Sequence, residues 1–429
     1  MSDGEIRIPG CTVGVAGAYD VVVCGGGMAG IGAGFAAARS GAKTALVEPY
    51  EVLGGLGSSG GVGNFCAGRN GLDAQGRVFD DVIDGLRAYG AYGKENGWHE
   101  RVNERWETPN NAFDHNVLPL VLQEMAVSCG VDVMYATSAV GVVMDDARVD
   151  AVLVHNRSLT QALGAKVVVD ATGEGVVARH AGAHELPDDP QFPNVIQPSF
   201  MVFLRKTEKE HAQPVPGPRH YTGDATPEYS IWREPDGRIG LKLKLFDVDT
   251  YDTGTGEGFI RALVAMRSRI PEAVRHFQEN HDPTYAFDYA APMLGLREGR
   301  RVEGDYVLTI DDARAGTRFD DGVAYGTFTV DANRTREKLP PYQIPYRSLV
   351  AKGVENCLVP GRGFSSDRLT LSSARVMPTC CMVGHAAGVA SALAVRDKIS
   401  VRDVPPAAVR EELLRDAGDG ELMRERLKV

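Results

Sequence analysis

Three glycines in a fixed spacing are the first residues whose pattern could do chemistry. Gly25-x-Gly27-x-x-Gly30 follows the apolar run from Tyr19 to Cys24 and opens a segment of helical composition that extends to Ser40. In this context the first glycine permits a sharp turn, the second lets a pyrophosphate approach the backbone, and the third allows close helix–strand packing. The helix N-terminus adds positive potential. The residues predicted to contact a dinucleotide here are Gly25, Gly27, Met28, Ala29 and Gly30.

An acidic residue completes this unit. The run from Ala42 to Glu48 predicts a second strand, and Pro49 should end it because proline cannot donate to a sheet ladder. Glu48 follows Gly30 by 48 − 30 = 18 residues, which places it to accept hydrogen bonds from an adenosine ribose. Together the elements form a βαβ unit that predicts an adenine dinucleotide, with NAD and FAD both open at this point.

Substrate groups are harder to find. Polar residues amid apolar strands are the candidates: an arginine could clamp a carboxylate by paired hydrogen bonds, and a tyrosine could relay a proton. They are Arg297, Arg300, Arg301, Arg347, Tyr306 and Tyr346, of which Arg347, Tyr346 and Arg301 are the predicted catalytic residues. Arg347 is the first choice because the segment from Ile344 to Leu349 should return the chain to the nucleotide-binding domain. Structural pairing of each side chain is the alternative. No nucleophile–base order, metal cluster or paired carboxylates stand out, so no metal is predicted.

Composition excludes several classes of function. The net charge is 46 − 57 = −11, which disfavours nucleic acid and anionic membrane surfaces as partners. Seven cysteines without C-x-x-C spacing suggest neither zinc nor a disulfide scaffold. The first residues lack the pattern of a signal peptide, so we expect a cytoplasmic protein. Two uncharged stretches, Val21 to Ala38 and Val376 to Val395, are rich in small residues and are expected to be buried rather than membrane-spanning.

The length of 429 residues favours two lobes, since a domain usually takes ~150. The expected fold class is α/β, a Rossmann-like nucleotide-binding domain with an inserted mixed α+β substrate lobe. The boundaries are predicted at 1–190 and 351–429 for the nucleotide-binding domain and 191–350 for the substrate lobe. Expected helices span 28–40, 76–97, 113–130 and 376–395. Expected strands lie near 19–24, 42–48, 131–135, 139–144, 149–155, 165–170, 199–204, 240–246 and 356–360.

With these elements in place, the chain resembles the FAD-dependent oxidoreductase family of the glutathione-reductase-like superfamily, and more distantly the fumarate reductase flavoproteins. The resemblance implies FAD as the cofactor and extends through nearly the whole chain. The similar segments are Tyr19 to Gly30, Leu53-Gly54-Gly55, Phe113-Asp114, Val167 to Gly173, Leu296 to Thr309, Ile344 to Leu349 and Leu358 to Gly388.

The resemblance also implies further FAD contacts, and a helix after Arg375 whose N-terminus points at the pyrimidine edge of the flavin. Covalent-flavin relatives carry a histidine in the glycine-rich loop after Glu48, whereas the first histidine here is His99, so FAD is expected to be non-covalent. Cys66 lies in that loop and is expected to be a small buried thiol. The implied FAD contacts are Gly54, Gly55, Val140, Ala171, Thr172, Gly173, Gly361, Arg362 and Thr379.

The expected function is oxidation of a small organic substrate by hydride transfer to flavin N5. Alternatives are a reductase of an activated C=C, an aromatic monooxygenase and a structural or sensory flavoprotein. Aromatic monooxygenases tend to have an Asp where this chain has Arg362, and an Ala-Asp-Gly turn where it has Ala171-Thr172-Gly173, so this class is disfavoured. Gly254-x-Gly256-x-Gly258 lacks a third glycine at the required offset, so no resident NAD(P)H site is expected. The small-molecule substrate is the expected partner, and the sequence leaves open whether the protein forms a homo-oligomer.

Overall fold

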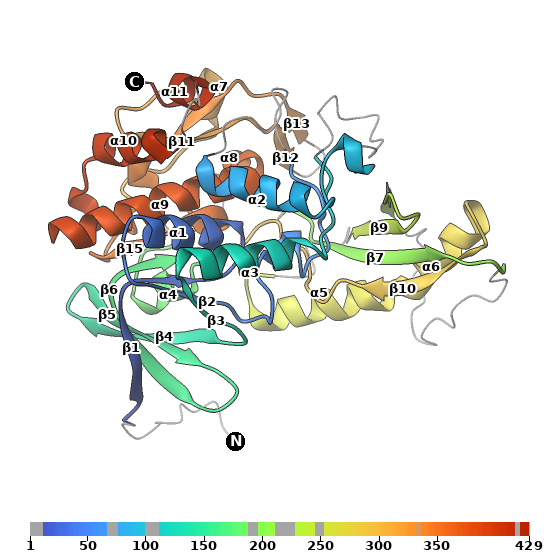
Figure 1. Cartoon of the computed structure of the whole chain (residues 1–429), viewed down its shortest axis with the longest axis horizontal. Helices are drawn as coiled ribbons and strands as arrows, with labels where there is room; N and C mark the ends of the chain where they lie inside the picture. The colour runs from blue at the N-terminus through green and yellow to red at the C-terminus, as the bar shows by residue number, and fades with distance from the viewer. Residues whose placement is uncertain are drawn as a thin grey trace.

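A seven-stranded sheet forms the centre of the molecule (Figure 1). The computed structural model describes residues 12–66, 76–98, 111–187, 196–210, 228–244, 253–332, 335–416 and 421–428. The strand order is β3-β2-β1-β6-β5-β4, and β15 also pairs with β6. The strands are β1 (Gly14–Cys24), β2 (Thr44–Val47), β3 (Asp132–Met134), β4 (Ser138–Asp145), β5 (Arg148–His155), β6 (Thr160–Asp170) and β15 (Cys357–Leu358).

This sheet combines a parallel nucleotide-binding half with an antiparallel meander. β1 pairs in parallel with β2 and β6, whereas β5 runs antiparallel to both of its neighbours, β4 and β6. The inner half of β1, from Val21 to Val23, is fully buried, which explains its uninterrupted β-branched sequence. Cys24 is in register with Asp170, so the carboxyl ends of β1 and β6 meet at one edge. The expected α/β class with a Rossmann-like sheet is confirmed.

Two helices pack unusually closely beside this sheet: α1 (Met28–Arg39) and α9 (Met377–Asp397). A Cβ atom built on Gly384 would lie 2.0 Å from the carbonyl oxygen of Ala29, and one on Gly388 would lie 2.2 Å from that of Ala33. Glycine is therefore required in α9 for the two backbones to touch. Figure 1 shows α1 between α9 and α3 (Leu118–Cys129), with α2 (Arg77–Ala88) on the same side.

The observed ends of α2 and α3 differ from the expected spans of 76–97 and 113–130. α2 stops at Ala88, and Gly90 and Gly93 follow with φ angles of 67° and 96°, which a helix does not tolerate. α3 starts only at Leu118, with a proline in its first turn, and ends at Gly130, whose φ of 70° is typical of a helix C-terminus. Turn-forming residues, rather than apolar periodicity, decided both boundaries.

A second, antiparallel sheet has the order β10-β7-β9-β8 and projects to one side of the first (Figure 1). Alternate residues of β7 serve its two faces: Phe200 and Val202 pack in a core with α5 and α6, whereas Met201 and Phe203 pack with Val62 of the glycine-rich loop. The sheet thus covers that loop. Its elements are β7 (Ser199–Lys206), β8 (Tyr229–Arg233), β9 (Ile239–Lys244), β10 (Tyr285–Ala290), α5 (Gly256–Ser268) and α6 (Ile270–Asn280).

The chain after Leu308 rejoins the first core. Leu308, Ala324 and Ile344 are buried in the same cluster as α1 and α9, although they fall within the predicted substrate lobe of 191–350. The predicted domain boundaries therefore stay predictions. The remaining elements are α4 (Val176–His180), α7 (Ile310–Ala315), β11 (Gly322–Gly326), β12 (Val330–Ala332), β13 (Thr335–Glu337), β14 (Tyr342–Pro345), α8 (Arg368–Ala374), α10 (Pro406–Asp416), α11 (Glu421–Leu427) and short 3-10 turns at Gly55–Gly57, Lys94–Asn96, Tyr346–Ser348, Gly361–Gly363 and Val401–Asp403.

By length and composition alone, α9 would qualify as a membrane-spanning helix. However, 94% of its most apolar 18-residue stretch is buried inside the protein. A buried core helix made of small residues gives the same composition, and the close contact with α1 accounts for those small residues.

The contact between α1 and α9 predicts opposite effects for two glycine-to-alanine substitutions. Gly384→Ala would place a methyl group 2.0 Å from a backbone oxygen and should destabilise the protein by about 2 kcal/mol or more, or prevent folding. Gly34→Ala in α1 meets its nearest heavy atom at 3.6 Å and should stabilise by up to ~1 kcal/mol through helix propensity. Urea unfolding at matched FAD saturation measures both, and similar midpoints for the two variants would contradict the contact.

Candidate active site

The loop between β1 and α1 gives each of its three glycines a different role. Gly25 has a φ of 105°, and a Cβ on it would lie 2.5 Å from the carbonyl oxygen of Ala171. A Cβ on Gly30 would lie 1.7 Å from the carbonyl oxygen of Gly25, so this glycine permits the helix to pack on the loop. Around Gly27 no described atom comes within 4 Å of a built Cβ. This open space at the N-terminus of α1 fits a pyrophosphate.

Glu48, directly after β2, holds this loop in place. Its Oε2 accepts a hydrogen bond of 2.6 Å from the backbone N–H of Gly26, and its Oε1 accepts one of 2.9 Å from that of Tyr50. Burial raises the pKa of Glu48, while the two hydrogen bonds oppose that shift. Each carboxylate oxygen keeps a second lone pair, so Glu48 can still accept from ribose hydroxyls. Sequence reasoning predicted the ribose role but missed the support of Gly26.

The second glycine pair packs directly on the first loop. The N–H of Gly54 donates to the carbonyl of Gly26 over 2.8 Å, and a Cβ on Gly55 would lie 3.0 Å from the Cα of Gly27. Gly54 and Gly55 have φ angles of 108° and 55°. The structure therefore brings these predicted FAD contacts beside Gly27.

A buried carboxylate organises the Ala171-Thr172-Gly173 turn. Asp170 at the end of β6 is fully buried and accepts hydrogen bonds from the Thr172 N–H at 3.1 Å, its hydroxyl at 2.6 Å and the Ala178 N–H at 2.9 Å. Burial raises the pKa of Asp170, and these hydrogen bonds oppose the shift. The sequence signal was an acid at the end of an apolar strand, which our sequence analysis did not use.

Gly361 and Arg362 lie against the same loops. Gly361 has a φ of 78°, and a Cβ on it would lie 2.8 Å from the Cβ of Ala29. The guanidinium of Arg362 pairs with Glu174 at 2.9 Å and donates to the carbonyl of Leu296 at 2.8 Å. Arg362 thus links the turn after β6 to the segment after β10, and its predicted contact with FAD stays a prediction.

Val140 and Thr379 mark the two ends of the candidate cofactor site. Val140 lies on β4 with 45% of its surface exposed, three residues after Thr137, whose N–H donates to the carbonyl of Glu48. Thr379 is buried in the first turn of α9. Because Gly384 and Gly388 contact Ala29 and Ala33 in turn, the two helices run in the same direction. α9 therefore begins about six residues, or roughly 9 Å, before the start of α1.

The three predicted catalytic residues all have structural partners. Arg347 forms an ion pair with Asp321 at 2.9 Å, and 52% of its side chain is exposed. The buried Tyr346 donates to the carbonyl of Val401 over 2.6 Å, and burial raises the pKa of Tyr346. Arg301 donates to the backbone carbonyls of Ser366 and Pro187 at 2.9 and 3.0 Å. These contacts favour structural roles, and the catalytic assignment stays a prediction.

Sequence reasoning named Arg297 but missed the group of charged residues next to the second sheet to which it belongs. Asp331 on β12 lies 3.1 Å from Arg375 and 3.4 Å from Arg297, and Lys242 on β9 interacts electrostatically with all three. The alternation Leu241-Lys242-Leu243 was a signal, because it places lysine on the face opposite the α5–α6 core. Nothing local in the sequence connects β9 with Arg375.

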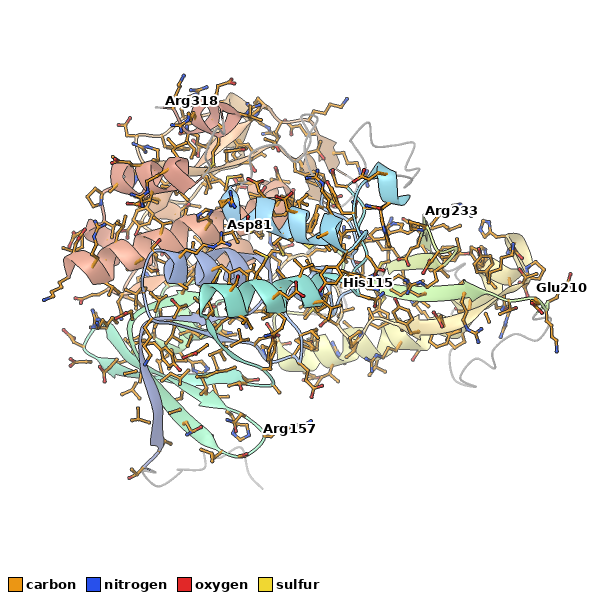
Figure 2. The ribbon with its side chains drawn as sticks, viewed as in Figure 1. Asp81, His115, Arg157, Glu210, Arg233 and Arg318 are labelled. Carbon is orange, nitrogen blue, oxygen red and sulfur yellow. The ribbon has the colours of Figure 1, made fainter. Side chains whose placement is uncertain are left out.

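A histidine and a tyrosine meet on this face as well. Nε2 of His115 lies 2.7 Å from the hydroxyl of Tyr289, and Phe203 stacks on both rings with centroid separations of 4.6 Å. Figure 2 shows His115 at the junction of α3 and the second sheet. Burial raises the pKa of Tyr289 to about 12. The two side chains can exchange a proton, and their separation of 174 residues explains why the sequence did not predict the pair.

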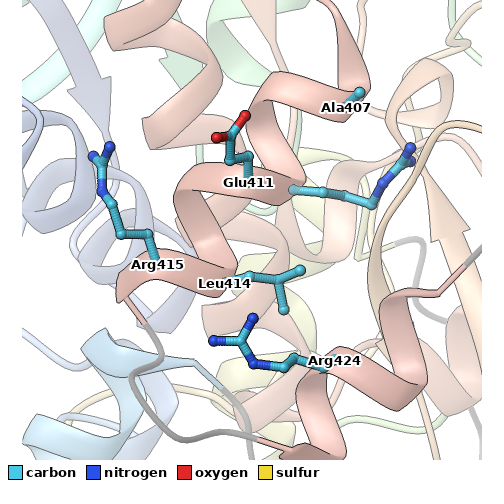
Figure 3. Close-up of a pocket in the computed structure, with 6 residues that line it drawn as sticks. Ala407, Glu411, Leu414, Arg415 and Arg424 are labelled. Atoms are coloured by element: carbon cyan, nitrogen blue, oxygen red, sulfur yellow. The ribbon is translucent and has the colours of Figure 1, made fainter.

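A surface pocket of about 460 Å³ lies between α10 and α11, away from the glycine loops (Figure 3). These helices contact each other and β11, so the pocket belongs to the outer surface of the C-terminal segment. Its lining residues are Ala407, Arg410, Glu411, Leu414, Arg415 and Arg424.

The open space at Gly27 predicts that a larger residue there blocks the cofactor but not folding. Gly27→Val should abolish FAD binding while the circular dichroism spectrum stays unchanged, because its side chain would fill only the space meant for the pyrophosphate. Gly256→Val is the matched control, since a Cβ on Gly256 also meets no described atom within 4 Å and that glycine begins α5 instead. Full FAD retention in Gly27→Val would contradict this location of the site.

Comparisons with known proteins agree with the cofactor that the site accommodates. A search of curated proteins finds no significant match. The fold is similar to a geranylgeranyl bacteriochlorophyll reductase-like protein from Thermoplasma acidophilum (14% identity, 95% of this chain and 84% of that chain, TM-score 0.46) and a flavoprotein/dehydrogenase from Cytophaga hutchinsonii (14%, 96% and 88%, 0.48). It is also similar to the myxobacterial chondrochloren halogenase (12%, 93% and 79%, 0.49). The profile described as FAD dependent oxidoreductase matches residues 20–413, and the chain therefore belongs to this family of FAD-dependent enzymes.

Proposed function

We propose that this FAD-dependent oxidoreductase oxidises a small organic substrate by hydride transfer from a substrate C–H to flavin N5, as a dehydrogenase or oxidase. Bound FAD would supply the electron-accepting ring. The observation that carries the proposal is the position of α9, whose N-terminus extends beyond that of α1 on the side of the glycine loops. The positive end of a helix there favours the negative charge that develops when electrons arrive.

The residues of this chain would divide the remaining tasks. Gly27 and the first turn of α1 bind the pyrophosphate, and Glu48 accepts from the ribose. The face of the second sheet that bears Met201 and Phe203 covers the glycine loop at Val62 and excludes water from the ring's surroundings. His115 and Tyr289 lie next to Phe203, where His115 can accept the substrate proton, because the raised pKa of Tyr289 keeps its hydroxyl protonated.

Several finer assignments belong to the same proposal. They are membership of the glutathione-reductase-like superfamily, distant similarity to fumarate reductase flavoproteins, a cytoplasmic location and a small-molecule substrate without nucleic-acid or membrane partners. Reduction of an activated C=C is the alternative direction of the same chemistry, and an aromatic monooxygenase is the other enzymatic alternative. Both need a separate electron donor for the flavin, so the donor distinguishes them from a dehydrogenase or oxidase.

We expect FAD to be bound without a covalent link. The described part of the glycine-rich loop, residues 53–66, contains no histidine, and Cys66 at its end is only half-buried. Precipitation of the purified yellow protein with acid should release all of the FAD into the supernatant, as measured by its absorption. Colour that remains with the precipitate would contradict the proposal, and Cys66→Ser would then show whether that thiol carries the link.

The electron donor gives the second test. The segment Gly254 to Gly258, whose glycine spacing differs from that of a nucleotide fingerprint, begins α5, and there the Thr255 hydroxyl accepts from the Gly258 N–H at 3.1 Å. Under anaerobic conditions NADH and NADPH should therefore reduce the flavin slowly or not at all. Members of a panel of small amines, alcohols and saturated carbonyl compounds should bleach it without nicotinamide.

Stopped-flow absorption measures these rates, and dithionite defines the amplitude of full reduction. Rapid bleaching by NADPH alone would contradict a dehydrogenase or oxidase and would favour the reductase or monooxygenase.

A further inference from the structure

One carboxylate is surrounded by several cations where the second sheet approaches α9. Asp331 lies 3.1 Å from Arg375, 3.4 Å from Arg297 and 3.9 Å from Arg336. Lys242 adds another positive charge within electrostatic range of Asp331. Within the described ranges Asp331 is the carboxylate that pairs with both Arg297 and Arg375, so these two arginines and Lys242 keep a local excess of positive charge in a protein whose net charge is −11. Keeping an excess of like charges close together and partly buried costs free energy unless an anion binds.

Arg375 provides a second and independent observation. Only 10% of its side chain is exposed, and its buried Nε has no hydrogen-bond partner among the described residues. One of its terminal nitrogens is already bonded to Asp331. A buried guanidinium N–H without an acceptor is costly, so its geometry points to an acceptor that a ligand supplies.

Lys242 faces the same group from β9. Its ammonium nitrogen lies 5.3 Å from the centre of the Trp232 ring, and no hydrogen bond or ion pair to it is found within the described ranges. Burial, Arg297 and Arg375 lower the pKa of Lys242 to about 8, while Asp331 and Cys66 oppose the shift. In the described part of the chain the lysine thus lies next to two arginines, and Asp331, which both arginines share, is the carboxylate within its electrostatic range.

The position of this group connects it with the candidate FAD site. Arg375 precedes Met377, the first residue of α9, by two residues. Lys242 pairs in register with Met201, which belongs to the sheet face that covers Val62 of the glycine-rich loop. Cys66 of that loop lies within electrostatic range of both Lys242 and Arg297. An anion bound here would lie at the junction of the second sheet, the glycine loop and the N-terminus of α9.

We propose that Lys242, Arg297 and Arg375 bind a carboxylate group of the substrate. The inference rests on the proposed function, because it takes the substrate side of the flavin to be this junction. A guanidinium presents planar N–H donors that match the two oxygens of a carboxylate, and the lysine supplies a further charge that any orientation can use. Asp331 keeps the two arginines apart and in place.

Binding by the FAD-loaded protein tests the proposal without turnover. Acetate, succinate and benzoate are titrated at constant ionic strength against the neutral analogue benzamide and against inorganic phosphate, while the absorption of bound FAD and the thermal midpoint are followed. At least one carboxylate should shift both signals, and benzamide should shift neither. Failure of all three carboxylates, equal binding of benzamide, or binding of phosphate alone would overturn the carboxylate assignment.

Variants of β9 locate the site. Lys242→Met should weaken binding of the active carboxylate about ten- to a hundredfold, the usual effect of losing one charged hydrogen bond. Lys242→Arg should restore most of it. Lys244→Met is the matched control, because Lys244 lies two residues along the same strand but approaches Glu228 at 3.5 Å, and its affinity should equal that of the wild type. An unchanged affinity in Lys242→Met would overturn the proposal.

The pH dependence supplies a readout that loss of structure would not mimic. As pH rises through about 8, Lys242 loses its positive charge, so the affinity of the wild type for the carboxylate should fall. The same step should be absent from both Lys242→Met and Lys242→Arg. A step that persists in these variants would assign the titration to Cys66 or another group and contradict the role of Lys242.

The two proposals fail separately. A protein that binds carboxylates through Lys242 but whose flavin is reduced only by NADPH would contradict the proposed oxidation and leave the anion site in place. A flavin that is bleached by a neutral substrate, in a protein that binds no carboxylate, would contradict this inference alone.

Discussion

The contact between the backbones of α1 and α9 is the constraint on which the candidate site depends. Gly384 and Gly388 let α9 touch the carbonyl groups of Ala29 and Ala33, which no side chain would allow. This contact brings a segment from the end of the chain beside the first helix and fixes how far α9 extends beyond it. The positive N-termini of the two helices then act at two points along one elongated cofactor.

Buried acids and a group of cations lie on the elements around this contact. Glu48 and Asp170 lie at the ends of β2 and β6, the strands on either side of β1, and hold the loops by accepting backbone N–H bonds. At the junction with the second sheet, the positive charges of Lys242, Arg297 and Arg375 lie close together. The acids thereby shape the cradle for the cofactor, while the cations remain available to a ligand.

The local backbone geometry of the site could be predicted from the sequence, while the contacts of these residues with FAD stay predictions. Each role expected for Gly25, Gly27 and Gly30 corresponds to a specific close approach or open space, because a strand, a turn and a helix within one short segment leave little conformational choice. The pairs formed by distant residues were not predicted. His115 with Tyr289, and Lys242 with Arg375, come from separate elements whose approach no local pattern encodes.

The sequence by itself determined the nucleotide-binding unit and the α/β class, because hydrophobic period, glycine spacing and the acid after β2 act over a few tens of residues. The choice of FAD over NAD came from the family resemblance, not from this spacing. Only the tertiary structure decided which polar side chains are free for a substrate. Arg347 and Arg301 were predicted from the sequence as substrate-binding arginines, but in the fold Arg347 pairs with Asp321 and Arg301 donates to backbone carbonyls. The role of an arginine depends on the charged groups that packing places next to it, and these groups can come from distant parts of the sequence.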